Sequence, residues 1–414
     1  MAPDDNLFAV AGSGTRPDDA ALDAVIREAF PDLAGATYLD VSARGPLPAA
    51  ARRAAEAMLM DQATGSVVKS AWFATAERVR AKVAARLSVS PNDIAFTKNA
   101  SEGLNLVGTA MRLQRGDRIV VAPSIEHPNN IFPWLWQAET AGAEVVSIRS
   151  QDGESIEDAI IAALDGRTRL VAVTTVDFAS GRRTDLRRLG AACRASDVFL
   201  LVDAAQSSGV LVEDLSGLPV DGWATAVQKG LLGLYGQGLL YVRRSWADRL
   251  RPAGLARFSV DLAETHEAAG PEGGWRLRSG AGRFELGNHN FVALAALEES
   301  LDLLALVGRE EVERRATGAA GALRAGIEAL GISVLPLAPA HQAHIVSLGD
   351  GLGCGHDTTD SAWITSLSTH LRERGVVHSV RRGVLRLSTH VHVLPEVVER
   401  ALGHFEDWRS SNPR

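Results

Sequence analysis

The segment formed by residues 198–243 constrains the fold more than any other part of the chain. It begins with a short apolar run, residues 198–202, which predicts a buried strand, and Asp203 follows at the carboxyl end of that strand. A second apolar run leads to Lys229, then to a glycine-rich loop and a third predicted strand. A buried carboxylate is costly unless a partner stabilises it. Because open α/β sheets bind ligands beyond the carboxyl ends of their strands, Asp203 and Lys229 are candidate site residues.

Asp203 and Lys229 together favour one chemistry. A lysine amine forms a Schiff base with the aldehyde of pyridoxal phosphate, and a carboxylate keeps the ring nitrogen protonated so that the ring accepts electrons. The two residues are 26 positions apart (229 − 203), which leaves room for one turn and one strand between them. Taken alone, Asp203 fits a helix N-cap equally well, and Lys229 fits a surface lysine. Gly233, Gly236 and Gly238 precede a strand rather than a helix, so they do not fit a dinucleotide-binding fingerprint.

The chain before residue 198 alternates between predicted strands and helices. The strands are residues 94–97, 118–122, 144–148 and 169–175, and the helices between them are residues 101–111, 130–140, 156–164 and 186–195. This alternation predicts βαβ units and a mostly parallel sheet. After residue 243, strands 332–335, 344–348 and 384–387 lie among four long helices, which predicts a smaller α+β domain. We therefore expect an N-terminal segment over residues 1–35, a large domain over 36–295 and a small C-terminal domain over 296–414.

Three further positions are candidate ligand contacts. The helix after residue 97 has Ser101 as its expected N-cap, and free N–H groups at a helix start bind phosphate; an ordinary capped helix is the alternative. His127 lies at a predicted strand end, where its ring would stack on a flat cofactor, although a lone histidine is more often structural. Arg386 lies inside a predicted strand. It would bind a substrate carboxylate through two hydrogen bonds, or form an ion pair with a neighbouring acid.

Composition excludes several functional classes. The 414 residues include 43 Lys and Arg against 50 Asp and Glu, a net charge of −7, so we expect no nucleic-acid partner. No apolar stretch has the roughly 18 residues of a membrane span, and two cysteines make no disulfide framework, so we expect a cytoplasmic protein. His390 and His392 alternate along a predicted strand edge without a carboxylate cluster. We expect them at the surface or at the edge of the active site and expect no metal.

Taken in order, several segments resemble the class V aminotransferases, a branch of the fold-type-I pyridoxal phosphate enzymes that includes cysteine desulfurases and isopenicillin N epimerase-like proteins. The resemblance covers residues 36–405 and rests on YLDVSARGPLP, TKNASEGLNLV, EHPNNIFPW, VDAAQ, QKGLLGLYGQGLLYV and RFELGNHN. It implies an α/β chain with the type I pyridoxal phosphate-dependent transferase fold and pyridoxal 5'-phosphate as the cofactor.

The resemblance also implies roles for individual residues around the cofactor. Ala100 and Ser101 would lie at the phosphate, and His127 would stack on the ring. Asp203 would pair with the pyridine nitrogen, and Gln206 would reach the phenolic oxygen of the ring.

The Schiff-base segment and the substrate contacts follow from the same resemblance. Lys229 would be the Schiff-base lysine, with Gln228 beside it near the phosphate. Arg386 would bind the carboxylate of a small amino-acid or keto-acid substrate. Asn288 lies in a segment that in this family serves the neighbouring subunit's cofactor site, which implies a homodimer with shared active sites.

The chain departs from the family pattern at four cofactor positions. Phe178 stands where an Asn is common, and Ala226 stands where a phosphate-binding Ser is common. Gln228 replaces a His, although glyoxylate-type aminotransferases also have Gln there, and Asn288 replaces a Thr. These changes indicate that phosphate binding is rearranged rather than lost.

The cysteines depart from the desulfurase pattern as well. Desulfurases carry a nucleophilic Cys on a loop ahead of the carboxylate-binding arginine, whereas VVHSVRRGVLRLS, residues 376–388, contains none. Cys354 lies too far upstream, and Cys193 lies inside a predicted helix. We therefore do not expect sulfur transfer through a protein persulfide.

These features predict chemistry at the α-carbon of a small amino acid, with transamination as the leading hypothesis. Elimination and epimerisation share the first steps of transamination, so a pyridoxal phosphate-dependent lyase or epimerase is the alternative. A non-catalytic binding protein with the same fold is a third hypothesis, disfavoured because Lys229, Asp203 and His127 are all present.

Overall fold

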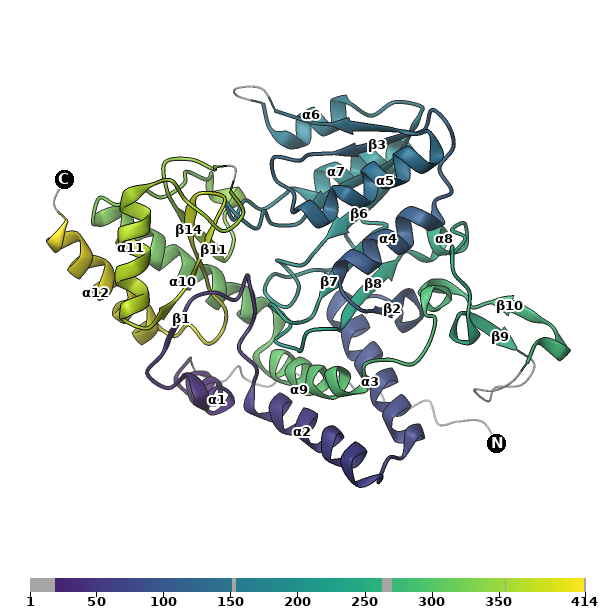
Figure 1. Ribbon diagram of the computed structural model, residues 1–414, viewed down its shortest axis with the longest axis horizontal. Helices are drawn as coiled ribbons and strands as arrows, with labels where there is room; N and C mark the ends of the chain where they lie inside the picture. Colours follow the sequence, from purple (N-terminus) through teal and green to yellow (C-terminus); the bar gives the residue numbers. More distant parts are fainter. Residues whose placement is uncertain (1–18, 151–153, 263–269, 354, 413–414) are drawn as a thin grey trace.

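A computed structural model describes residues 19–150, 154–262, 270–353 and 355–412 of the chain. A large part built around a seven-stranded sheet is followed by a smaller C-terminal α+β part (Figure 1). Residues 1–18, which belong to the predicted N-terminal segment, lie outside the described residues. No helix in the described ranges combines the length and the apolar character needed to cross a membrane.

The large sheet has the strand order β2-β8-β7-β6-β5-β3-β4. Its strands are β2 (Ile94–Thr97), β3 (Arg118–Val121), β4 (Glu144–Ser147), β5 (Thr168–Thr174), β6 (Phe199–Asp203), β7 (Gly222–Ala226) and β8 (Gly238–Val242). β8 runs antiparallel to both of its neighbours, whereas the other neighbouring strands pair in parallel. The predicted mostly parallel sheet is therefore confirmed. The central strands are apolar on both faces because helices cover both sides, as parallel sheets require.

Side chains from successive strand residues reach opposite helical layers. Leu200 and Val202 belong to one core, with helices α3, α6, α7 and α9, while Phe199 and Leu201 belong to the other, with α4 and α5. Figure 1 shows α9 lying beside α2 and α3. The helices of this part are α2 (Ala49–Thr64), α3 (Lys69–Leu87), α4 (Ala100–Ala110), α5 (Phe132–Ala141), α6 (Ile156–Ala162), α7 (Leu186–Ala195), α8 (Arg244–Ala247) and α9 (Phe291–Val307).

The C-terminal part contains an antiparallel sheet of order β11-β14-β13 covered by helices. Its elements are α10 (Arg309–Ala329), β11 (Ile345–Leu348), α11 (Ala362–Glu373), β12 (Val376–Val377), β13 (Ser379–Arg381), β14 (Val384–Ser388) and α12 (Pro395–Ser411). Near the N-terminus, β1 (Thr37–Tyr38) follows α1 (Asp19–Ala29) and pairs in parallel with β12. The domain limits at residues 36 and 295 remain predictions.

One local prediction was wrong. Residues 332–335 form no strand but a single bridge from Val334 to Leu348, because Pro336 follows and has no N–H for a ladder. Beyond residue 250, a short antiparallel pair is formed by β9 (Val260–Leu262) and β10 (Trp275–Leu277). Short 3-10 helices connect the other elements, at Pro31–Leu33, Pro91–Asp93, Pro128–Asn130, Arg257–Ser259, Pro271–Gly273, Gly280–Phe284 and Pro339–His341.

Candidate active site

Asp203 and Lys229 lie at the same edge of the large sheet. Asp203 is the last residue of β6, and Lys229 follows β7 by three positions. Because β6 and β7 are parallel neighbours, their carboxyl ends meet at one edge. Asp203 is buried and accepts a hydrogen bond from the backbone N–H of Ala205 at 3.0 Å. The juxtaposition predicted from the sequence is therefore present.

Burial shapes the charge state of both groups. It lowers the pKa of Lys229 to about 8; the Asp203 carboxylate opposes this shift, and the guanidiniums of Arg386 and Arg381 add to it. Burial raises the pKa of Asp203, while the Ala205 N–H and the Lys229 charge act in the opposite direction. A lysine with a lowered pKa supplies a neutral, nucleophilic amine near neutral pH.

His127 lies beside this pair in an aromatic cluster. Its ring centroid is 5.0 Å from the ring of Phe178 and 5.7 Å from the ring of His356, and both contacts are edge-to-face. Nδ1 accepts a hydrogen bond from the Asn129 N–H at 3.1 Å, which fixes the ring. Burial and the Lys229 charge lower the pKa of His127 to about 4, so the ring is neutral at physiological pH. A neutral ring of fixed orientation suits stacking on a flat cofactor.

The start of α4 differs from the prediction in one respect. The N-cap is Asn99 rather than Ser101, because the Asn99 side chain accepts the Glu102 N–H at 2.9 Å. Ala100 and Ser101 are the first two helical residues. In the described part of the chain, no acceptor binds their backbone N–H groups. The helix start thus keeps the two free donors that an anion needs.

Gln206 and Ser42 carry polar atoms that fit a missing ligand. Nε2 of Gln206 donates to the Ser42 carbonyl at 3.2 Å, but Oε1 of Gln206 and Oγ of Ser42 are buried and without a partner among the described residues. Buried polar groups are normally paired, so unpaired ones near Asp203 and Lys229 suit a bound polar molecule. The predicted contact of Gln206 with the phenolic oxygen remains a prediction.

Gln228 and Lys229 are covered by the glycine of the YLDVSARGPLP segment. Gly45 N–H donates to the Gln228 carbonyl at 2.7 Å. A Cβ at Gly45 would lie 2.2 Å from the Lys229 carbonyl oxygen, so only glycine allows this close approach. Gly45 thereby brings its segment directly against the backbone that carries Lys229. The predicted role of Gln228 at the phosphate is not tested by these contacts.

Arg386 is held by groups of this chain. Its Nη2 lies 3.2 Å from Oδ1 of Asp40, Nη1 donates to the Phe178 carbonyl at 2.7 Å, and Nε donates to Ser379 Oγ at 3.1 Å. Of the two alternatives that the sequence left open, the ion pair is present. Arg381, on β13, is a second guanidinium near Lys229; it is less buried and bonds Asp357 at 2.5 Å. Sequence reasoning missed Asp40 and Arg381, although both lie in segments it singled out.

The turn ahead of Arg386 leaves no room for a cysteine-bearing loop. β13 and β14 are joined by only two residues, Arg382 and Gly383, which both have positive φ. Cys193 is fully buried on α7, and burial raises the pKa of its thiol to about 12. Cys354 lies outside the described residues. A buried thiol with a raised pKa is a poor nucleophile.

Asn288 is exposed and lines a cavity of about 270 Å³ together with Lys98, Glu102 and Gly236. The predicted contribution of Asn288 to the cofactor site of a neighbouring subunit therefore remains a prediction. Ala226 is buried at the end of β7. Among the described residues, no group of three or more metal-binding side chains occurs.

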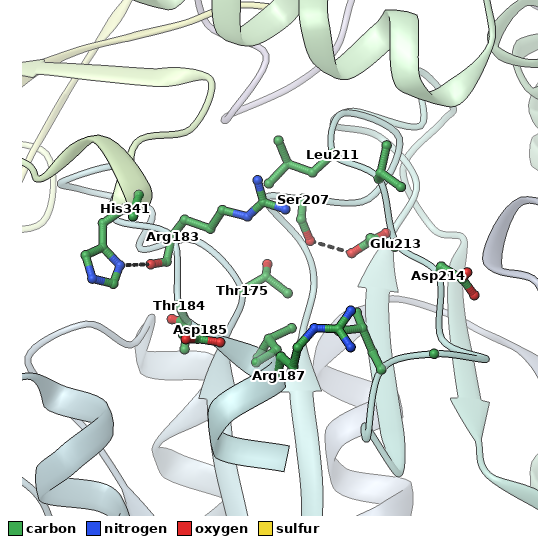
Figure 2. A pocket seen from close by; sticks show the side chains of 15 residues that line it. Thr175, Arg183, Thr184, Asp185, Arg187, Ser207, Leu211, Glu213, Asp214 and His341 are labelled. Atoms are coloured by element: carbon green, nitrogen blue, oxygen red, sulfur yellow. Dashed lines mark hydrogen bonds between the residues drawn. The ribbon is translucent and has the colours of Figure 1, made fainter. Parts of the chain in front are cut away.

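A larger cavity, of about 500 Å³, is lined by none of the predicted site residues, although the Thr175 N–H in its wall donates to the Asp203 carbonyl at 3.0 Å. Figure 2 shows Arg183 and Arg187 reaching over it and Ser207 facing Glu213, to which its hydroxyl donates at 2.6 Å. Thr175 forms part of its lining. Neither Lys229 nor Asp203 lines this cavity. Choosing the active site by cavity size alone would therefore have put it in the wrong place.

His390 and His392 do not lie at the surface, which was one of the two positions expected for them. Both are buried, and their Nε2 atoms bond backbone carbonyls. The reason is that the segment after β14 turns into the interior, where a neutral imidazole can donate to a carbonyl.

Residues 37–358 match the family described as aminotransferase class-V. The chain belongs to the class V aminotransferase family. Members of this family bind pyridoxal phosphate. The class V chain is 31% identical over 296 residues to a protein named probable cysteine desulfurase from Methanothermobacter thermautotrophicus, covering 70% of this chain and 72% of the relative. It is 28% identical to a second protein named probable cysteine desulfurase, from Pyrococcus abyssi, over 80% of this chain and 82% of the relative.

Two solved structures show a similar fold. The apo structure of a cysteine desulfurase from Thermococcus onnurineus NA1 matches with a TM-score of 0.78 and 24% identity, covering 96% of this chain and 99% of that one. The cystine C–S lyase C-DES, in complex with its reaction product cysteine persulfide, matches with a TM-score of 0.78 and 25% identity, covering 91% and 99%. The predicted fold-type-I fold is confirmed.

Proposed function

We propose that this class V protein binds pyridoxal phosphate through Lys229 and cleaves the C–S bond of a small sulfur amino acid. The residues suit the cofactor: Lys229 has a nucleophilic amine, Asp203 faces it, and the α4 start offers two free N–H donors. When bound, the cofactor supplies an electron sink for carbanionic charge at the α-carbon.

The observation that carries the choice of reaction is the two-residue turn between β13 and β14. Arg382 and Gly383 leave no loop for a nucleophilic cysteine ahead of Arg386. The similarity to C-DES supports release of the sulfur product into solution instead of transfer to the protein. Transamination, the leading hypothesis from the sequence, receives less support, because the named relatives described above are desulfurases and a C–S lyase.

Each residue then has a defined task. The neutral amine of Lys229 removes the α-proton of the substrate, and the Asp203 carboxylate holds a proton on the ring nitrogen. The His127 ring, held by the Asn129 N–H, would stack on the bound cofactor and so help to orient it. The substrate carboxylate binds a guanidinium. That guanidinium belongs to Arg386, once Arg386 has released Asp40, or to Arg381.

The overall reaction balances without an added oxidant. With L-cystine as substrate, the Cβ–S bond breaks and its electron pair leaves with the sulfur, so that cysteine persulfide is released. The remaining three-carbon fragment takes up water and yields pyruvate and ammonia. No keto acid is consumed.

The test is incubation of the pyridoxal phosphate-loaded protein with L-cystine in the absence of any keto acid. We expect equal amounts of pyruvate, ammonia and persulfide, and loss of all three in Lys229→Ala. Turnover that requires pyruvate or 2-oxoglutarate would instead identify a transaminase, and loss of optical activity without pyruvate would identify an epimerase.

A further inference from the structure

The backbone that carries Lys229 passes very close to a second loop. Gly230, the residue after the lysine, packs against residues 208–209: a Cβ at Gly230 would lie 2.4 Å from the Ser208 carbonyl oxygen. Gly209 has φ +84°, and a Cβ there would lie 2.2 Å from the Gly230 carbonyl oxygen. The two backbones therefore touch directly, and the carbonyl groups of Gly209 and Gly230 need a donor from elsewhere.

His390 supplies that donor. Its Nε2 lies 2.9 Å from the Gly230 carbonyl oxygen and 3.2 Å from the Gly209 carbonyl oxygen, while Nδ1 accepts the Val391 N–H at 2.8 Å. Since Nδ1 accepts, the ring proton is on Nε2 and is shared between the two carbonyls. The side chain is fully buried, and burial lowers the pKa of His390 to about 3, so this single tautomer persists over the working pH range.

The next hydrogen bonds along the loop limit its movement further. Gly45 N–H binds the Gln228 carbonyl, and the Leu232 N–H binds the Lys229 carbonyl at 3.0 Å. The backbone carbonyls at positions 228, 229 and 230 thus all accept hydrogen bonds. Only the carbonyl of residue 230 accepts its hydrogen bond from a side chain, that of His390. That side chain follows β14, the strand that carries Arg386.

We infer that His390 is a positioning residue for Lys229: its Nε2–H fixes the backbone that presents the amine, and links the amine to the strand that carries Arg386. Without this donor, two buried carbonyls lose their partner, and the loop shifts to find water or another donor. A small shift of a reacting group is enough to slow its chemistry severely. The inference rests on the proposed bond between Lys229 and pyridoxal phosphate, and not on the reaction that follows.

The test compares two amides that differ only in reach. In His390→Gln the amide nitrogen lies near the position of Nε2 and can donate to the Gly230 carbonyl, whereas in His390→Asn it is too short. The readout is the rate at which the apo-protein captures added pyridoxal phosphate, followed by absorbance from pH 6 to 10. We expect His390→Asn to capture the cofactor on the order of tenfold more slowly than wild type, with a changed pH midpoint, and His390→Gln to restore most of the rate.

His392→Gln is the matched control, because His392 is also buried, its ring stacks on that of His390 at 6.2 Å, and its Nε2 bonds the Tyr38 carbonyl rather than that of Gly230. We expect its capture rate and pH midpoint to match wild type, whatever its stability. Equal rates of cofactor capture by His390→Asn and wild type would overturn the inference. Misfolding of His390→Gln would also overturn it if His392→Gln folds, because the shape of the His390 ring, and not its N–H, would then be what matters. Failure of the wild type to capture the cofactor would instead overturn the proposed function.

Discussion

The Asp40 carboxylate lies 3.2 Å from Nη2 of Arg386, and the two side chains are 7% and 1% exposed. Asp40 also accepts a hydrogen bond from the Ser379 hydroxyl at 2.9 Å, so it is held in place. A substrate carboxylate that binds Arg386 must therefore compete with a carboxylate of the protein itself. This competition makes Asp40 part of substrate recognition in the proposed reaction.

Replacing Asp40 by Asn should tighten substrate binding and weaken the fold. Without the competing charge, the Arg386 guanidinium is free for the substrate, so we expect the KM for L-cystine to fall by about tenfold, equivalent to about 1.4 kcal/mol. Breaking a buried ion pair should lower the free energy of unfolding by about 3 kcal/mol. Steady-state kinetics and urea unfolding measure the two effects. A KM that rises in Asp40→Asn would show that Asp40 orients Arg386 for the substrate instead of competing with it.

Cofactor capture should depend on pH through Lys229. An unperturbed lysine has a pKa near 10.4, but burial lowers that of Lys229 to about 8. Only the neutral amine attacks an aldehyde, so the capture rate should rise with pH and reach half its maximum near pH 8. Stopped-flow absorbance of the apo-protein measures this midpoint. A midpoint above pH 10 would contradict the buried position of the amine, and Lys229→Ala serves as the blank.

Neither cysteine should be needed for C–S cleavage. Cys193 is buried with a raised pKa, and the turn before Arg386 has none, so Cys193→Ala and Cys354→Ala should each keep kcat within about threefold of wild type. Pyruvate release from L-cystine is the assay. Because Cys193→Ala leaves a small cavity, its thermal stability should be measured in parallel. Loss of activity in Cys354→Ala at unchanged stability would revive sulfur transfer through a protein persulfide.

Asp203→Asn should separate cofactor capture from catalysis. Lys229 still reacts with the cofactor, but the ring nitrogen loses its anionic partner, so kcat should fall by about 100-fold or more. The absorbance of the bound cofactor should remain near one equivalent per chain. Asp203→Glu keeps the charge and should recover part of the rate. A kcat unchanged in Asp203→Asn would remove Asp203 from the mechanism.

The positions of the strands along the chain and the juxtaposition of Asp203 and Lys229 were predictable because they follow from local patterns. Apolar runs fix the strands, and a parallel sheet places the carboxyl ends of neighbouring strands at one edge. The N-cap at Asn99 was missed by two positions, since Asn and Ser both cap helices and only the hydrogen bond to Glu102 distinguishes them. The burial of His390 was not predicted, because alternation on a strand does not reveal which other segment covers the side chain.

The sequence by itself determined the α/β class, the mostly parallel sheet and the lysine and carboxylate that the chemistry needs, since each depends on residues close together in the chain. Only the tertiary structure decided which partners these residues meet: Asp40 against Arg386, Gly45 against Lys229, and His390 against Gly230. These contacts join segments separated by more than 150 positions. They depend on how the C-terminal part and the segment around Gly45 pack against the large part, which no local pattern encodes.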